Sequence, residues 1–94
     1  ATAKAAISGM TRSMARELGS ETIRVNCVIP GSALTERKLG TYIDETAATQ
    51  ISTRQALSHR RIQPADIRNM MLFLAADESR SGAGQIFIVD AGWV

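Results

Sequence analysis

Few side chains in the 94-residue sequence have types that could do chemistry directly. Cys27 is its one cysteine and His59 its one histidine. One cysteine excludes an internal disulfide and a cysteine-rich zinc site, and one histidine argues against a histidine-based metal site. We therefore predict no metal, a structural Cys27 and an ordinary His59. Lys4, at the start of a helix, and the sharp turn at Pro30-Gly31 remain, although on their own they indicate only a solvated surface lysine and the end of a strand.

The composition is that of a globular protein, with 45% hydrophobic and 21% charged residues. The net charge of +2 is weak, and the arginines are spread from Arg12 to Arg80. We therefore predict no nucleic-acid partner, because a basic helix-turn-helix would need clustered arginines. The longest apolar run, 70–76, is far shorter than the roughly 20 residues of a membrane span. With no membrane partner and no secretion signal at the start, a cytoplasmic protein is expected.

Four elements must position these candidates. Ile7, Met10, Met14 and Leu18 recur at helical spacing, which predicts a helix from Ala1 to Leu18, and Gly19 stands where a helix would end. Apolar, β-branched residues over 23–29 predict a buried strand that Pro30-Gly31 terminates.

The second half of the chain repeats the order of helix and strand. Pro64 and Asp66 mark the start of a helix that extends to about Ala76. A second apolar strand covers 86–89. Two strands joined by a helical crossover predict a parallel α/β fold. Two strands are too few for a stable parallel sheet, so we expect the chain to be the end of a larger α/β domain.

Between the first strand and the second helix lies a long polar excursion, 32–58. It predicts a loop followed by one or two short helices around 46–57. A long excursion after a strand is often functional, which makes this stretch a candidate for substrate contact.

The sequence resembles the short-chain dehydrogenases/reductases over essentially its whole length. The matches to the active-site helix are Lys4-Ala5-Ala6, Gly9 to Ser13 and Glu17-Leu18-Gly19. The match to the cofactor strand and loop is Ile23 to Gly31 with Thr35. The matches to the closing helix and last strand are Pro64 to Ile67, Phe73 to Asp77 and Val89 to Trp93.

This resemblance implies the C-terminal portion of a Rossmann-like doubly wound parallel sheet. That portion would hold the active-site helix, the last two strands, the last helix and a substrate-lid segment at about 32–58, all within one domain, 1–94. The family binds NAD(H) or NADP(H), of which we favour NAD, and uses a Ser-Tyr-Lys set. In its Tyr-x-x-x-Lys motif, counting back from Lys4 leads to the position just before Ala1. The tyrosine, serine and glycine-rich loop would then lie outside the chain, and we expect the chain alone to be inactive.

The resemblance also assigns the site residues. Lys4 would be catalytic, because a nearby ammonium favours the phenolate of a tyrosine whose ordinary pKa is about 10, and it would also bind the nicotinamide ribose. Pro30 and Gly31 would turn the chain past the nicotinamide. Ala33 would contact the carboxamide, and Thr35 the carboxamide or a phosphate. Within the lid region no residue is singled out, Tyr42 included.

The substrate class is less sharply indicated. Asp90 to Trp93, Arg16 to Leu18 and Arg61 to Pro64 resemble the aldose (xylose-type) 1-dehydrogenases, which implies oxidation of an aldose to its lactone. The alternatives are a 3-oxoacyl-(acyl-carrier-protein) reductase and a non-catalytic association module. The substrate would be a small alcohol or carbonyl compound, and the family implies a homo-oligomer, dimer or tetramer.

Two positions depart from the family pattern. Ala91 stands where the family commonly has a glycine, and Ala83 stands where it often has a threonine.

Overall fold

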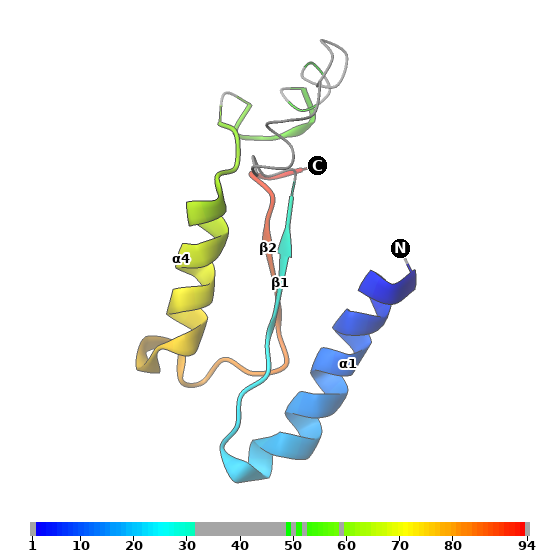
Figure 1. Cartoon of the computed structure of the whole chain (residues 1–94), viewed down its shortest axis with the longest axis vertical. Helices are drawn as coiled ribbons and strands as arrows, with labels where there is room; N and C mark the ends of the chain where they lie inside the picture. The colour runs from blue at the N-terminus through cyan, green and yellow to red at the C-terminus, as the bar shows by residue number, and fades with distance from the viewer. Residues whose placement is uncertain (1, 32–48, 50, 52, 59, 94) are drawn as a thin grey trace.

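The structure is a computed structural model that describes residues 2–31, 49, 51, 53–58 and 60–93. Its elements follow one another as α1 (Thr2–Leu18), a 3-10 turn (Gly19–Glu21), β1 (Cys27–Pro30), α4 (Pro64–Ala75), a second 3-10 turn (Asp77–Ser79) and β2 (Ile86–Val89) (Figure 1).

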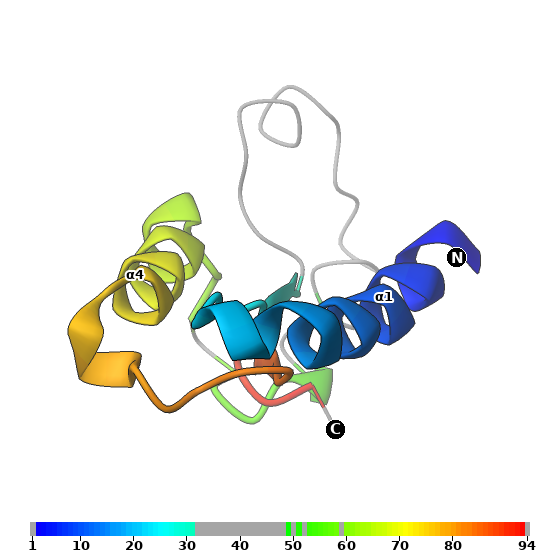
Figure 2. The ribbon, with the colours of Figure 1, turned by 90° about the horizontal axis from the view of Figure 1, so that it is seen from below.

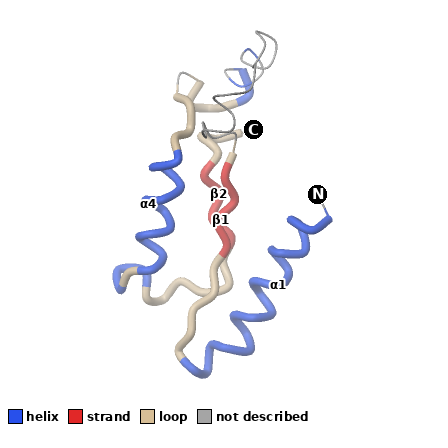
Figure 3. The backbone as a smooth tube through the Cα atoms, in the orientation of Figure 1, coloured by secondary structure: helices blue, strands red, loops and turns tan. Residues whose placement is uncertain are grey.

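The two strands form a parallel sheet in which Cys27 pairs with Ile86 and Pro30 with Val89. The helices α1 and α4 lie on opposite sides of this sheet, as Figures 1 and 2 show together. Figure 3 shows the two strands side by side between the helices, and their pairing is parallel. The predicted α/β fold with a helical crossover is therefore confirmed.

The end of α1 differs from the prediction in one respect. The α-helix ends at Leu18, as predicted, but Gly19 continues into a 3-10 turn and does not take the left-handed conformation. That conformation belongs to Thr22, at φ 61° and ψ 28°. The Thr22 amide donates to the Gly19 carbonyl at 3.0 Å, and the Ile23 amide donates to the Leu18 carbonyl at 3.3 Å. Such a pair of bonds around a left-handed residue is a Schellman motif, in which glycine is the usual choice.

The first strand is shorter than predicted and begins at Cys27 instead of Ile23. Arg24 and Asn26 explain the difference, because their side chains bind the connection between α4 and β2. The Arg24 guanidinium donates to the carbonyls of Leu74, Ala76, Ser79 and Gly82 and to the Ser79 hydroxyl, at 2.8 to 3.3 Å. Asn26 donates to the Gly82 carbonyl and accepts from the Gln85 amide. Residues 23–26 therefore run beside a turn, and strand pairing starts only where β2 begins.

The second half of the chain follows the prediction closely. Pro64 is the first residue of α4, and the Gln63 amide donates to Asp66 Oδ2 at 2.8 Å, which satisfies a donor ahead of the first turn. The helix ends at Ala75, one residue before the predicted position, and β2 covers the predicted residues 86–89. In the polar excursion, the described residues 49, 51, 53 and 54 are helical, within the stretch predicted to hold short helices.

Little of the apolar surface is covered. Among the described residues, Ile62 is the one hydrophobic side chain that is fully buried, at 3% exposed. Large apolar side chains on α4 and β2 remain open to solvent, with Leu72 and Ile88 each 61% exposed. Both faces of a parallel sheet normally carry cover. This exposure is what the end portion of a wider sheet should show.

Candidate functional site

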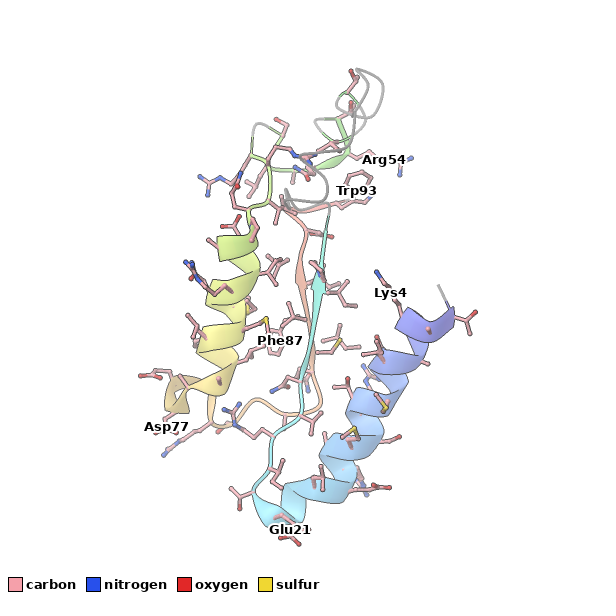
Figure 4. All side chains as sticks on the ribbon, viewed as in Figure 1. Lys4, Glu21, Arg54, Asp77, Phe87 and Trp93 are labelled. Carbon is pink, nitrogen blue, oxygen red and sulfur yellow. The ribbon has the colours of Figure 1, made fainter. Side chains whose placement is uncertain are left out.

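Lys4 stands in the first turn of α1, and its side chain is exposed. Figure 4 shows it at the upper end of α1, with Glu21 just beyond the lower end of that helix. No hydrogen bond or ion pair joins its ammonium group to any part of the chain that the structure describes. A cation at a helix N-terminus opposes the helix dipole, at a cost of about 0.3–1 kcal/mol. The Lys4 side chain therefore makes no hydrogen bond or ion pair within the described residues that would stabilise the fold, and its amine is available to a ligand.

Pro30 and Gly31 end β1 at the carboxyl edge of the sheet. The amides of Cys27 and Gly31 donate to the Gln85 and Val89 carbonyls, both at 2.9 Å. Because these donors alternate along the strand, the Pro30 nitrogen lies on the opposite edge, so the missing N–H costs no bond to β2.

The need for glycine at position 31 comes from crowding inside the chain. A Cβ atom there would lie 2.8 Å from both Cα and Cβ of Asp90 and 2.9 Å from Ile62 Cδ1. The φ angle of Gly31 is not positive, so space and not backbone freedom explains the residue. The sequence predicted a close approach to a nicotinamide, and the structure adds this second, internal reason.

A backbone clasp joins the end of the polar excursion to the end of the chain. The Ala56 amide donates to the Gly92 carbonyl at 2.8 Å, the Leu57 amide donates to the Ala91 carbonyl at 3.0 Å, and Gln55 forms an antiparallel bridge with Trp93. We call residues 55–57 and 91–93 together the terminal clasp. The sequence analysis missed it, because Asp90-Ala91-Gly92 signals a turn but no local pattern indicates its distant partner.

The clasp encloses polar groups that are removed from water. Gln55 is 3% exposed, and its Nε2 donates to the Arg60 carbonyl at 3.0 Å. Gln55 Oε1 and Arg61 Nη2 are buried without a hydrogen-bond partner. A buried unpaired group costs about 1–3 kcal/mol. The Arg61 side chain is therefore not wholly solvated, since its Nη2 is removed from water.

Several predicted residues lie outside the described part of the chain: Ala33, Thr35, Tyr42 and His59. The structure therefore describes three of the five predicted site residues, Lys4, Pro30 and Gly31, together with the end of the predicted lid.

A groove of about 450 Å³ lies between β1 and α4. Its walls are mainly apolar, formed by Val28, Pro30, Ile67, Met71 and Leu74. The groove has the character of a packing surface between layers. Within the described residues, no group of three or more His, Cys, Asp or Glu side chains could hold a metal ion. No helix among those residues has the length and hydrophobicity to cross a membrane.

Comparison with known proteins gives matches along the whole chain. The family model described as enoyl-(acyl carrier protein) reductase matches residues 1–94. A D-xylose 1-dehydrogenase of Caulobacter vibrioides is 47% identical over 92 residues, which cover 98% of this chain and 36% of the relative. A probable galactose dehydrogenase of Rhizobium meliloti is 40% identical, covering 97% and 35%. A 3-oxoacyl-[acyl-carrier-protein] reductase of Thermotoga maritima is 39% identical, covering 100% and 37%.

Solved structures share the fold. A 4-hydroxyisoleucine dehydrogenase complexed with NADH superposes with a TM-score of 0.87 and 31% identity, covering 99% of this chain and 38% of that one. A short-chain type dehydrogenase/reductase from Mycobacterium ulcerans gives a TM-score of 0.89 at 28% identity, covering 96% and 32%. The chain thus spans about a third of the length of these proteins, from 32% to 38%.

Proposed function

Because the chain belongs to the short-chain dehydrogenase/reductase family, we propose that it forms the carboxy-terminal part of an NAD(P)-dependent oxidoreductase. The reaction moves a hydride between the nicotinamide and an alcohol or carbonyl carbon. Relatives of this chain are dehydrogenases and reductases, and one solved neighbour is complexed with NADH. Since the chain spans 36% of the length of the xylose dehydrogenase relative, we propose this activity for the whole protein of which the chain is a part.

The observation that carries the proposal is the placement of Lys4. Its ammonium group is exposed and without a partner among the described residues, on the first turn of a helix that flanks a parallel sheet. Ligands of open α/β sheets bind outside the carboxyl ends of the strands, and β1 ends there with the backbone of Gly31. A free amine donor on a helix that flanks the strands (Figure 4) suits a ribose with adjacent hydroxyl groups. These residues fit a nicotinamide nucleotide.

In the proposed chemistry Lys4 has two roles. Its amine donates a hydrogen bond to a ribose hydroxyl, which orients the nucleotide. Its positive charge lowers the pKa of a tyrosine supplied by the rest of the protein, so that the phenolate can accept the proton of the substrate hydroxyl. Bound NAD(P) would take up the hydride from the carbinol carbon. The alcohol thereby loses one hydride and one proton and becomes a carbonyl, and reduction runs in the reverse direction.

Pro30 and Gly31, followed by Ala33 and Thr35, hold the nicotinamide end of the cofactor in this proposal. NAD is favoured over NADP. The predicted lid, about 32–58, covers the substrate. The tyrosine, the serine and the glycine-rich loop come from outside the chain, so the 94 residues alone are expected to bind no cofactor and to have no turnover.

For the substrate we propose an aldose, which is oxidised to its lactone. The two sugar dehydrogenases, at 47% and 40% identity, support this choice. The alternative is a 3-oxoacyl thioester, supported by the reductase at 39% identity. The test uses the whole protein and compares D-xylose-dependent reduction of NAD with acetoacetyl-thioester-dependent oxidation of NADH and NADPH. Turnover of the thioester alone would replace the aldose assignment.

A second candidate function is association without catalysis. On α1, the side chains of Ile7, Met10 and Met14 are 46%, 54% and 38% exposed. They give this helix an exposed apolar face that can pack against another chain. The same face supports our proposal that the whole enzyme is a homo-oligomer, either a dimer or a tetramer. The cytoplasmic location of the protein remains a prediction. A whole protein that assembles normally but turns over neither substrate would favour this second function.

The catalytic role is tested by replacing Lys4 with methionine in the whole protein. Arg16→Met is the matched control, because it removes a positive charge from an exposed position on the same helix. We expect Lys4→Met to lower kcat by about 10²–10⁴-fold, the range typical of lost acid–base assistance. Arg16→Met should change kcat by less than about twofold, because it removes no acid–base assistance. Equal effects of the two substitutions would refute the role of Lys4.

A further inference from the structure

Both described ends of the polar excursion rest on one short turn. Gly31 lies just before the excursion, and a Cβ placed on it would lie 2.8 Å from both Cα and Cβ of Asp90. At the other end, Ala56 and Leu57 donate to the carbonyls of Gly92 and Ala91. The turn Asp90–Gly92 therefore contacts two segments that are separated by more than twenty positions of the sequence.

The shape of this turn is set by its own residues. The Gly92 amide donates to Asp90 Oδ1 at 2.9 Å, and Ala91 and Gly92 follow with positive φ angles of 58° and 75°. This conformation aims the carbonyls of Ala91 and Gly92 at the excursion. A Cβ on Gly92 would lie 2.7 Å from Ala56 Cβ. The fit between the turn and Ala56 thus requires glycine for two reasons, conformation and space.

We infer that the turn Asp90–Gly92 is a positioning element of the substrate site, in which Gly92 sets the place of residues 55–57 relative to Gly31. This inference rests on the proposed function, in which the excursion covers the substrate and Gly31 adjoins the nicotinamide. The turn fixes residues 56 and 57 by two backbone hydrogen bonds and packs against Gly31 on its other side. Displacing a positioning segment by about 1 Å can cost about 10²-fold in rate.

Lys4 is on α1, and among the described residues no hydrogen bond joins it to the turn. A change at Gly92 should therefore disturb substrate binding at residues 55–57 and leave cofactor binding largely intact. That separation distinguishes a positioning role from a loss of stability, which would reduce the amount of active enzyme and leave the Michaelis constants unchanged.

The test compares Gly92→Ala with Gly84→Ala in the whole protein. Gly84 also has a positive φ angle, 69°, and a Cβ there would meet Ala15 Cβ at 3.4 Å, at the opposite end of the sheet. The control thus introduces the same backbone strain away from the turn. Steady-state kinetics with D-xylose and NAD, or with acetoacetyl thioester and NADH or NADPH if that is the substrate, give KM and kcat. Fluorescence titration gives the Kd of the reduced cofactor used.

We expect Gly92→Ala to raise the KM of the substrate at least about tenfold, with the Kd of the reduced cofactor changed less than about twofold, since the misplacement affects one segment. Gly84→Ala should leave both constants within about twofold of wild type. Asp90→Ala, which loses the bond to the Gly92 amide, should raise KM, and Asp90→Asn, which can keep it, should restore the wild-type value.

Equal KM values for Gly92→Ala and Gly84→Ala in an active enzyme would overturn the positioning role and leave the proposed function standing. Wild-type protein that binds no reduced cofactor and turns over neither substrate would refute the proposed function and, with it, the inference. If Gly92→Ala fails to fold, the Asp90→Ala and Asp90→Asn pair decides the matter. Identical KM values for those two variants would overturn the inference.

Discussion

Thr22 offers a direct test of how the chain leaves α1. It is an exposed, β-branched residue held in the left-handed conformation, at φ 61°. An L-residue pays about 1–2 kcal/mol for this conformation, and glycine pays almost none. Glycine also has more conformational freedom in the unfolded chain, which costs about 0.4–1 kcal/mol. The difference predicts that Thr22→Gly raises the free energy of unfolding by about 1 kcal/mol.

The assay is urea and thermal unfolding of the whole protein. A gain of about 1 kcal/mol should raise Tm by about 2–4 °C in a domain of 150–250 residues. Because the Thr22 side chain is exposed, the substitution removes no buried contact that could mask the gain.

Gly19 provides the companion measurement. A Cβ there would meet nothing within 4 Å, and the φ angle is not positive. Gly19→Ala should therefore be stabilising as well, by about 0.4–1 kcal/mol. If Gly19 were instead the left-handed end of the helix, the same substitution would destabilise. A loss of stability with either Thr22→Gly or Gly19→Ala would refute the reasoning.

Four further substitutions at three positions test packing in the whole protein, each by urea unfolding. Ala91→Gly should stabilise by about 0.5–1 kcal/mol, because Ala91 has a φ angle of 58°; a loss would show that the angle is wrong. Gly31→Ala should destabilise by about 1–3 kcal/mol, since the new methyl meets the Asp90 backbone at 2.8 Å, and an unchanged midpoint would contradict that crowding. Arg24→Ala should cost about 3 kcal/mol by leaving carbonyls of the α4–β2 connection without their charged donor, and Arg24→Lys should cost less. Equal losses for both Arg24 variants would mean that the several N–H donors of the guanidinium contribute no more to stability than the side chain of lysine can.

The regular elements could be predicted because their signals are local. Pro64 and Asp66 mark a helix start through a fixed backbone angle and a carboxylate that accepts an amide three residues away. Ile86 to Val89 form an apolar run too short for a helix, bounded by turn residues. For both elements the predicted start agrees with the structure.

The first strand shows where local signals stop. Residues 23–29 have the composition of one strand, but strand pairing needs a partner, and β2 offers one only from Ile86. Arg24 instead binds four carbonyls between Leu74 and Gly82. An arginine within an apolar run indicates a polar partner, and nothing in the sequence says which carbonyls it will reach. The shortened strand follows from contacts fifty or more residues away.

The candidate site divides along the same line. Lys4 could be singled out because its motif is local, and its lack of any internal partner among the described residues agrees with a role toward a ligand. Gly31 could be singled out as well, but its contact with Asp90 depends on the sheet register. The terminal clasp depends on two pairings that no window of sequence contains.

These contacts change the meaning of a glycine after a strand. A glycine that serves only a ligand would leave empty space in the chain's own structure, whereas Gly31 is already filled on one side by Asp90 and Ile62. One face of the residue thus supports the turn Asp90–Gly92, and only the other is free for a nicotinamide. Under the proposed function, substitution at Gly31 would therefore disturb the cofactor contact and the lid together. Gly92 can separate substrate positioning from cofactor binding, because the atoms nearest to a Cβ placed there belong to Ala56.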